Sequence, residues 1–163
     1  MRGNVGTRLQ RMAEGHCQAL LLAHAGLTRL GMGDRIRMSL PVETFVPAPG
    51  QGVIGIECRS DDRSTRRMIR PLDHAATATR VAAERALSTR LGGNCTVPVA
   101  GHAYRQRERL YLIGLVASPD GRQMVRAAVH GRPLRAAELG IRLAEHILAA
   151  GADRILGALG VAV

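Results

Sequence analysis

The chain has 163 residues, of which 46% are hydrophobic and only 2% aromatic, and its formal net charge at pH 7 is +10. This length allows one ordinary domain or two small ones. No apolar run approaches the roughly 20 residues of a membrane helix, and no signal-peptide pattern is present. We therefore expect a soluble cytoplasmic protein with no membrane partner.

The positive charge predicts an anionic partner. All 23 cationic residues are arginine, whose planar guanidinium pairs bidentately with carboxylate or phosphate. Nucleic acid is the usual partner for such a charge, but the sequence lacks aromatic stacking residues and a continuous basic run. A small molecule rich in carboxylates fits at least as well, so both classes stay open from composition alone.

The first part of the chain predicts a partial doubly wound α/β domain. Val5, Leu9 and Met12 have helical spacing, and Gly15 is a plausible helix stop. The apolar run over residues 19–23 is typical of a strand that is buried on both faces of a parallel sheet. Residues 25–38 predict a further short helix or turn.

A connection rich in proline and glycine follows, over residues 41–57, and its apolar end predicts a short strand at 53–57. Next comes a charged segment and a helix over about residues 75–91. Asp73 is a reasonable N-cap for this helix, and Gly92 suits the position just after its C-terminus.

The last part predicts a small domain with a three-stranded antiparallel sheet covered by helices. The predicted strands are residues 97–104, 110–117 and 124–130, joined by turn-forming segments. A helix with Ile141, Ala144, Ile147 and Leu148 on its apolar stripe would cover the sheet and end at Gly151.

Three segments are candidates for chemistry, and each has a plain structural alternative. Glycines between Arg2 and Arg8 precede a helix and can form an anion cradle, although a solvated helix start explains them too. The segment 47–52 can offer the Gln51 amide to a ligand, or it is simply an interdomain linker. Cys95 lies in a glycine-rich loop between a helix and a strand, which favours an accessible nucleophile over a buried thiol.

The other polar residues give weaker signals. The six histidines have no ligand spacing, so no metal site is predicted. Glu84 is interpreted as a surface charge or an ion-pair partner, with Arg80 four residues earlier as the candidate cation. Cys17 and Cys58 lie at the edges of apolar segments and are interpreted as packing residues.

Four motifs in order resemble the porphobilinogen deaminases, also called hydroxymethylbilane synthases. These motifs are RGNVGTRL, LLLAHAGLTRLG, PAPGQGVIGIE and AERALSTRLGGNCTVPVAGHA. The last motif contains the loop to which that family attaches its cofactor. The similarity covers nearly the whole chain and corresponds to the C-terminal half of such an enzyme.

The resemblance implies a transferase of tetrapyrrole and haem biosynthesis. Such enzymes join four porphobilinogen molecules, lose ammonia at each addition and release hydroxymethylbilane. It implies a dipyrromethane cofactor covalently attached to Cys95, with porphobilinogen and polypyrrole intermediates as ligands. Arg2, Arg8, Arg29, Arg85 and Gln51 would bind the cofactor and its acidic side chains.

The resemblance also implies that no catalytic residue is present, because the family's catalytic aspartate belongs to an N-terminal domain. We therefore expect a fragment that is inactive alone, and the family suggests a monomer. A separately encoded N-terminal half is one candidate partner, and the sequence leaves open whether such a half exists. Residues 1–46 would be the back half of the second domain, and residues 47–60 would return to the missing first domain. Residues 61–163 would form the domain that carries the cofactor.

Two other hypotheses remain at this stage. An arginine-rich module that binds nucleic acid is the alternative function, and steep salt dependence of DNA binding would distinguish it. A reading frame that persists without a function is the third.

Overall fold

The computed structural model describes residues 2–93 and 97–161 and divides into two compact units, Met1–Leu40 and Pro41–Val163. The first unit contains α1 (Val5–Ala13), α2 (His24–Arg29) and the short 3-10 helix η1 (Gly33–Arg35). The second unit contains α3 (Arg63–Ile69), η2 (Arg70–Leu72), α4 (Ala75–Arg90), β1 (Val99–Gln106), β2 (Arg109–Ala117), β3 (Met124–Gly131), η3 (Pro133–Arg135), α5 (Ala136–Ile147), η4 (Leu148–Ala152) and α6 (Asp153–Ala158).

The first unit is helical where the sequence predicts a helix. Asn4 is the N-cap of α1, and its side chain accepts the backbone N–H of Thr7 at 2.9 Å. Gly3 precedes it with φ +121°, a value that side chains rarely tolerate. The predicted strand at residues 19–23 is wrong, because this segment is extended without strand pairing and Leu21 is 67% exposed.

The predicted strand at residues 53–57 is also wrong. The segment carries no regular structure, and the side chains of Val53, Ile54 and Ile56 are all exposed. Both wrong predictions have the same cause: an apolar run becomes a strand only when a neighbouring strand pairs with its backbone. In the described residues, β1, β2 and β3 pair only with one another.

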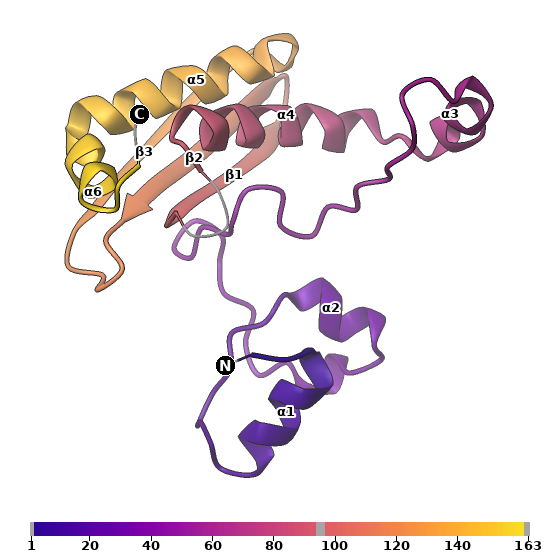
Figure 1. The fold of residues 1–163 in the computed structure, drawn as a ribbon, viewed down its shortest axis with the longest axis vertical. Coiled ribbons are helices and arrows are strands. Elements are labelled where there is room, and N and C mark those ends of the chain that lie inside the picture. Colours follow the sequence, from indigo (N-terminus) through magenta and orange to yellow (C-terminus); the bar gives the residue numbers. More distant parts are fainter. Residues whose placement is uncertain (1, 94–96, 162–163) are drawn as a thin grey trace. The chain divides into compact units, whose positions relative to one another are not determined.

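The predicted three-stranded antiparallel sheet is confirmed, in the order β1-β2-β3. Its centre pairs Ala103 with Leu112 and Leu112 with Val129. Helices α4 and α5 pack together on one face of this sheet (Figure 1). Leu87 and Leu143 are fully buried between the helices and the strands, so the core of the second unit is aliphatic.

The final helices differ in detail from the prediction. Ala144 and Ile147 of the predicted stripe are fully buried, but Ile141 is 47% exposed. The buried face of α5 includes Leu139 and Leu143 in its place. Gly151, with φ +104°, marks a kink after which the chain continues as α6, so the helical region does not end there. His74 rather than Asp73 is the N-cap of α4. No helix in the described residues is long and apolar enough to cross a membrane.

Helices α4 and α5 pack closely at Gly140. A Cβ atom at this position would lie 2.3 Å from the carbonyl oxygen of Ala83 and 2.8 Å from the Cβ of Ala86. Backbone oxygen cannot move aside as a flexible side chain can, so the two helices would have to separate. The packing of the two helices therefore requires glycine, which has no Cβ atom, at position 140.

We predict that Gly140→Ala lowers the free energy of unfolding by about 1–3 kcal/mol, the usual cost of overpacking a core. The matched control is Gly157→Ala in α6, where a Cβ atom would meet nothing within 4 Å. This control should be neutral or slightly stabilising, because alanine has the better helix propensity. Urea unfolding measures both, and equal midpoints for the two variants would contradict the packing account.

Helix α3 begins at a strong cap. The carboxylate of Asp62 accepts the backbone N–H of Thr65 at 3.0 Å and the hydroxyl groups of Thr65 and Ser64 at 2.7 and 2.8 Å. These hydrogen bonds, the backbone bond from Thr65 first, lower the pKa of Asp62 from 3.8 to about 2.

The stabilisation of α3 by this cap should therefore be present above pH 3.8 and be lost as the pH falls through about 2. We expect an NMR titration of the Asp62 carboxyl carbon to give a midpoint near 2. The amides of α3 should lose protection over the same pH interval. A midpoint near 3.8 would mean that the cap does not form in solution.

Candidate cofactor-binding site

Glu84 is the one charged residue that is buried in the described part of the chain, at 6% exposure. Its Oε2 accepts the backbone N–H of Gly50 and its Oε1 accepts the backbone N–H of Ala103, both at 2.7 Å. The Nδ1 of His102 lies 3.9 Å from Oε1. A buried carboxylate is costly unless its oxygens are hydrogen-bonded. Two short bonds to backbone N–H groups meet that requirement.

The segment around Gly50 is held to the free edge of the sheet as well. The backbone N–H of Gly101 in β1 donates to the carbonyl oxygen of Pro47 at 2.9 Å. Gly101 and Ala103 lie two residues apart, so their N–H groups point to the same side of β1, away from β2. Pro47 and Glu84 thus occupy successive donors of an edge strand, which fixes the segment 47–52 beside the end of β1.

The turns of the segment 47–52 need glycine. Gly50 and Gly52 have φ +75° and +78°, and the N–H groups of Gln51 and Val53 close turns onto Ala48 and Gly50. The side chain of Gln51 is exposed. The backbone of Gln51 is therefore held in place through its neighbour Gly50, while the side-chain amide of Gln51 remains accessible to solvent.

Helix α4 ends directly before the predicted attachment loop. Gly92 has φ +64°, and the N–H of Gly93 donates to the carbonyl oxygen of Ser88 at 2.7 Å. A Cβ atom on Gly93 would lie 2.8 Å from the carbonyl oxygen of Ser88, so this turn disfavours larger residues. Cys95 itself lies outside the described residues. The described residues on either side of it are Gly93, in the turn after α4, and Val97, which is buried in the core.

The remaining predicted site residues fall in both units. Arg85 follows Glu84 on α4 and is exposed. Because Glu84 is anchored through its carboxylate, the backbone next to Arg85 is held in place as well. Arg2 and Arg29 are exposed in the first unit. Arg8 is half-buried, and its Nε donates to the carbonyl oxygen of Gly3 at 2.8 Å.

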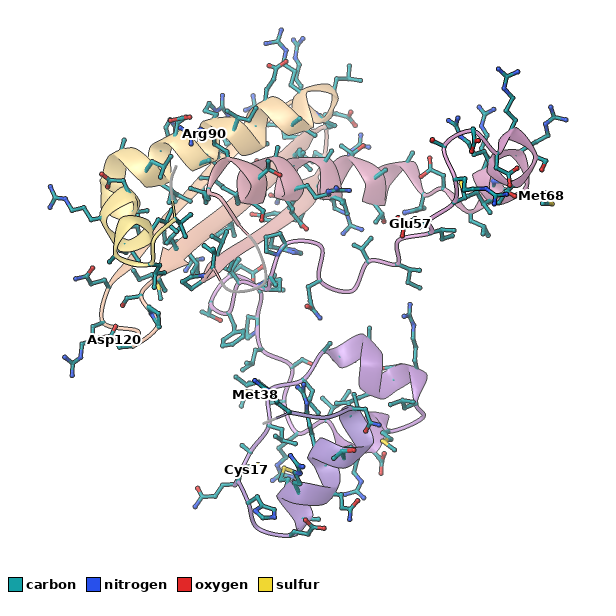
Figure 2. The ribbon with its side chains drawn as sticks, in the orientation of Figure 1. Cys17, Met38, Glu57, Met68, Arg90 and Asp120 are labelled. Atoms are coloured by element: carbon teal, nitrogen blue, oxygen red, sulfur yellow. The ribbon has the colours of Figure 1, made fainter. Side chains whose placement is uncertain are left out.

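Within each unit, the exposed side chains are of a type that pairs with carboxylates. Arg2, Arg29 and Arg85 present guanidinium groups at the surface, and Gln51 adds an amide donor. No set of three or more histidine, cysteine or acidic side chains is gathered for a metal ion anywhere in residues 2–93 and 97–161. Figure 2 shows the described side chains on the ribbon.

Sequence reasoning missed the role of Glu84. Its interpretation as a surface charge or as the partner of Arg80 is wrong, because the carboxylate is buried and Arg80 donates to the hydroxyl of Thr77 instead. The helical spacing contained a signal. Glu84, Leu87 and Leu91 have positions i, i+3 and i+7, which place the carboxylate on the apolar face of α4.

We predict that Glu84→Gln lowers the free energy of unfolding by about 2–3 kcal/mol, because the glutamine NH₂ group would face one of the two backbone donors. The matched control is Glu108→Gln, since the Glu108 side chain is 93% exposed and pairs only with Arg105. Its effect should stay within about 0.5 kcal/mol. Chemical unfolding monitored by circular dichroism measures both, and a neutral Glu84→Gln would show that the buried bonds contribute nothing.

The sequence matches two protein-family models. Residues 1–67 match the family model described as porphobilinogen deaminase, dipyromethane cofactor binding domain. Residues 78–149 match the model described as porphobilinogen deaminase, C-terminal domain. The first match contains Arg2, Arg8, Arg29 and Gln51, and the second contains Arg85 and Cys95. The chain therefore belongs to the porphobilinogen deaminase family.

Proposed function

We propose that this chain supplies the cofactor-carrying part of a hydroxymethylbilane synthase that works in the cytoplasm, with Cys95 as the attachment residue. In this proposal the sulfur of Cys95 is bonded as a thioether to a dipyrromethane. When bound, that group supplies the free pyrrole position at which porphobilinogen units are added with loss of ammonia. The residues of this chain hold its acidic side arms and orient it.

The observation that supports the proposal best is the shared anchor at Glu84. One buried carboxylate fixes Gly50, beside Gln51, and the helix that carries Arg85. The same helix ends at the glycine turn immediately before Cys95. The positions of Gln51, of Arg85 and of the start of the attachment loop therefore all depend on the contacts of Glu84 and its helix. Such preorganisation is what a site needs to hold a ligand in one orientation.

The charge of the chain fits the same ligand class. Acetate and propionate arms make a pyrrole chain a polyanion, and each arm can pair with a guanidinium fork. Exposed Arg2, Arg29 and Arg85 are available for such pairs. Arg8 can contribute its terminal nitrogens while its Nε stays bound to Gly3. The role of these residues is to hold carboxylates, and none of them is proposed as the acid or base of the reaction.

The shape of the first unit supports a requirement for a complementary domain. Leu27 is the only core residue among described residues 2–40, which is far less apolar burial than an independent domain needs. The apolar side chains of the segment 53–56 are exposed, which suits a segment that pairs with a neighbouring strand. We propose that residues 1–46 pack against the rest of a second domain. We further propose that residues 53–60, the part of the predicted crossover 47–60 beyond the contacts with Glu84 and β1, pair with a first domain. The catalytic aspartate would lie in that first domain.

The test is mass spectrometry of the chain after incubation with porphobilinogen and the N-terminal part of an active porphobilinogen deaminase. We expect a mass increase equal to two linked pyrrole units, localised by peptide mapping to Cys95. Formation of hydroxymethylbilane should require both polypeptides. An adduct that survives Cys95→Ser would defeat the assignment of the attachment residue.

Cys17→Ser is the matched control, because Cys17 is another free thiol of the chain and is half-buried. This variant should load to the same extent as the unchanged chain. Loading of the unchanged chain with loss of loading in both serine variants would point to a general effect of thiol removal and would contradict the proposal.

A further inference from the structure

Four arginines gather on one face of α3 and the turn that follows it. Arg63, Arg66, Arg67 and Arg70 have positions i, i+3, i+4 and i+7, so they lie within one stripe along the helix. All four are exposed. Figure 2 shows nitrogen-tipped side chains spreading into solvent around Met68, on the same helix. The cofactor site described above uses none of them.

This stripe is unfavourable without a counter-charge, because like charges three and four residues apart destabilise a helix. The nearby carboxylate of Asp62 is already used as the helix cap and lies 3.6 Å from Arg59. Arg66 donates to the carbonyl oxygen of Ser60 at 3.3 Å. Among residues 2–93 and 97–161, no ion pair involves any of the four arginines of the stripe.

A hollow of about 580 Å³ lies among these side chains. It is lined by Cys58, Arg63, Arg66, Arg67, Ile69 and Arg70. Cys58 and Ile69 are half-buried, so the hollow combines apolar atoms with a cationic border. Its volume is in the range of pockets that take small organic ligands.

We propose that this hollow is a second anion site, which takes a polycarboxylate built on an apolar pyrrole frame. It rests on the proposed function in one respect: the ligand class that fits is the linear tetrapyrrole that the enzyme would release, with its acetate and propionate arms. Guanidinium forks bind the carboxylates, and the pyrrole frame covers Ile69 and Cys58. The site would hold product outside the cofactor cleft.

Two features favour a compact carboxylate over a nucleic acid. The seven residues of α3 span only ~10 Å and Arg70 follows directly, so all four arginines are within reach of one short ligand. A phosphodiester backbone offers no apolar surface for Ile69 and Cys58, and the hollow has no aromatic side chain on which a base could stack.

A second hollow lined by arginines provides the contrast. It has a volume of about 510 Å³ and contains Arg132, Arg135 and Arg142. There, Arg135 is paired with Glu138 at 3.5 Å, and Arg142 donates to the carbonyl oxygen of His130 at 2.8 Å. Its cations are partly engaged within the protein, so it is the matched site at which arginine removal should have little effect on ligand binding.

The test is fluorescence titration of the full chain with uroporphyrin I, a stable porphyrin octacarboxylate that carries acetate and propionate arms. Removal of two forks in Arg63→Gln/Arg67→Gln should weaken binding at least ~10-fold. Arg63→Lys/Arg67→Lys keeps the charge but lacks the guanidinium fork. Its affinity for uroporphyrin should lie between that of the unchanged chain and that of Arg63→Gln/Arg67→Gln. Arg132→Gln/Arg135→Gln removes the same charge from the other hollow and should change affinity less than ~2-fold.

Equal weakening by the two glutamine pairs would overturn the proposal, since it would indicate attraction by net charge alone. Displacement of uroporphyrin by a DNA duplex at physiological salt, lost in Arg63→Gln/Arg67→Gln, would also overturn it in favour of nucleic acid. The titration is repeated with Cys95→Ser, which should bind equally. Failure of covalent loading and failure of this second site are therefore separate results.

Discussion

The arrangement of the second unit depends on the buried carboxylate of Glu84. Its two oxygens accept N–H groups from Gly50 and Ala103, which are 34 and 19 residues away along the chain. Because a charge at this depth is stable only with both partners present, the helix, the strand edge and the Pro/Gly segment must come together as one structure. A carboxylate thereby specifies where the Gln51 and Arg85 positions lie with respect to each other.

The same contacts that cover the free edge of β1 also build the candidate site. The N–H groups of Gly101 and Ala103 would form an open sheet edge if Pro47 and Glu84 did not accept them. By contrast, the apolar segment 53–56 has no such cover, and the first unit has little core of its own. The two parts of the chain therefore differ in self-sufficiency. The second has a continuous aliphatic core, whereas Leu27 is the only buried hydrophobic residue among described residues 2–40.

Much of this could be predicted from local signals. The three strands of the sheet, the glycine turn after α4 and the helix at residues 5–13 follow from alternation, turn residues and helical spacing. The apolar runs at 19–23 and 53–57 misled because strand formation depends on a partner strand that a local pattern does not encode. Glu84 misled because its polarity predicts exposure, whereas its spacing with Leu87 predicts burial, and the spacing determined its position. The four ordered motifs pointed to the family because each is a specific order of residues, which composition alone does not determine.

The most direct test of this account is amide hydrogen exchange at Gly50 and Ala103, followed by NMR. If the Glu84 carboxylate holds both segments, the two amides should be strongly protected with similar opening free energies, although Gly50 lies in a loop. Both should lose protection together in Glu84→Gln. An amide of Gly50 that exchanges at the rate of an unstructured peptide in the unchanged chain would contradict the account.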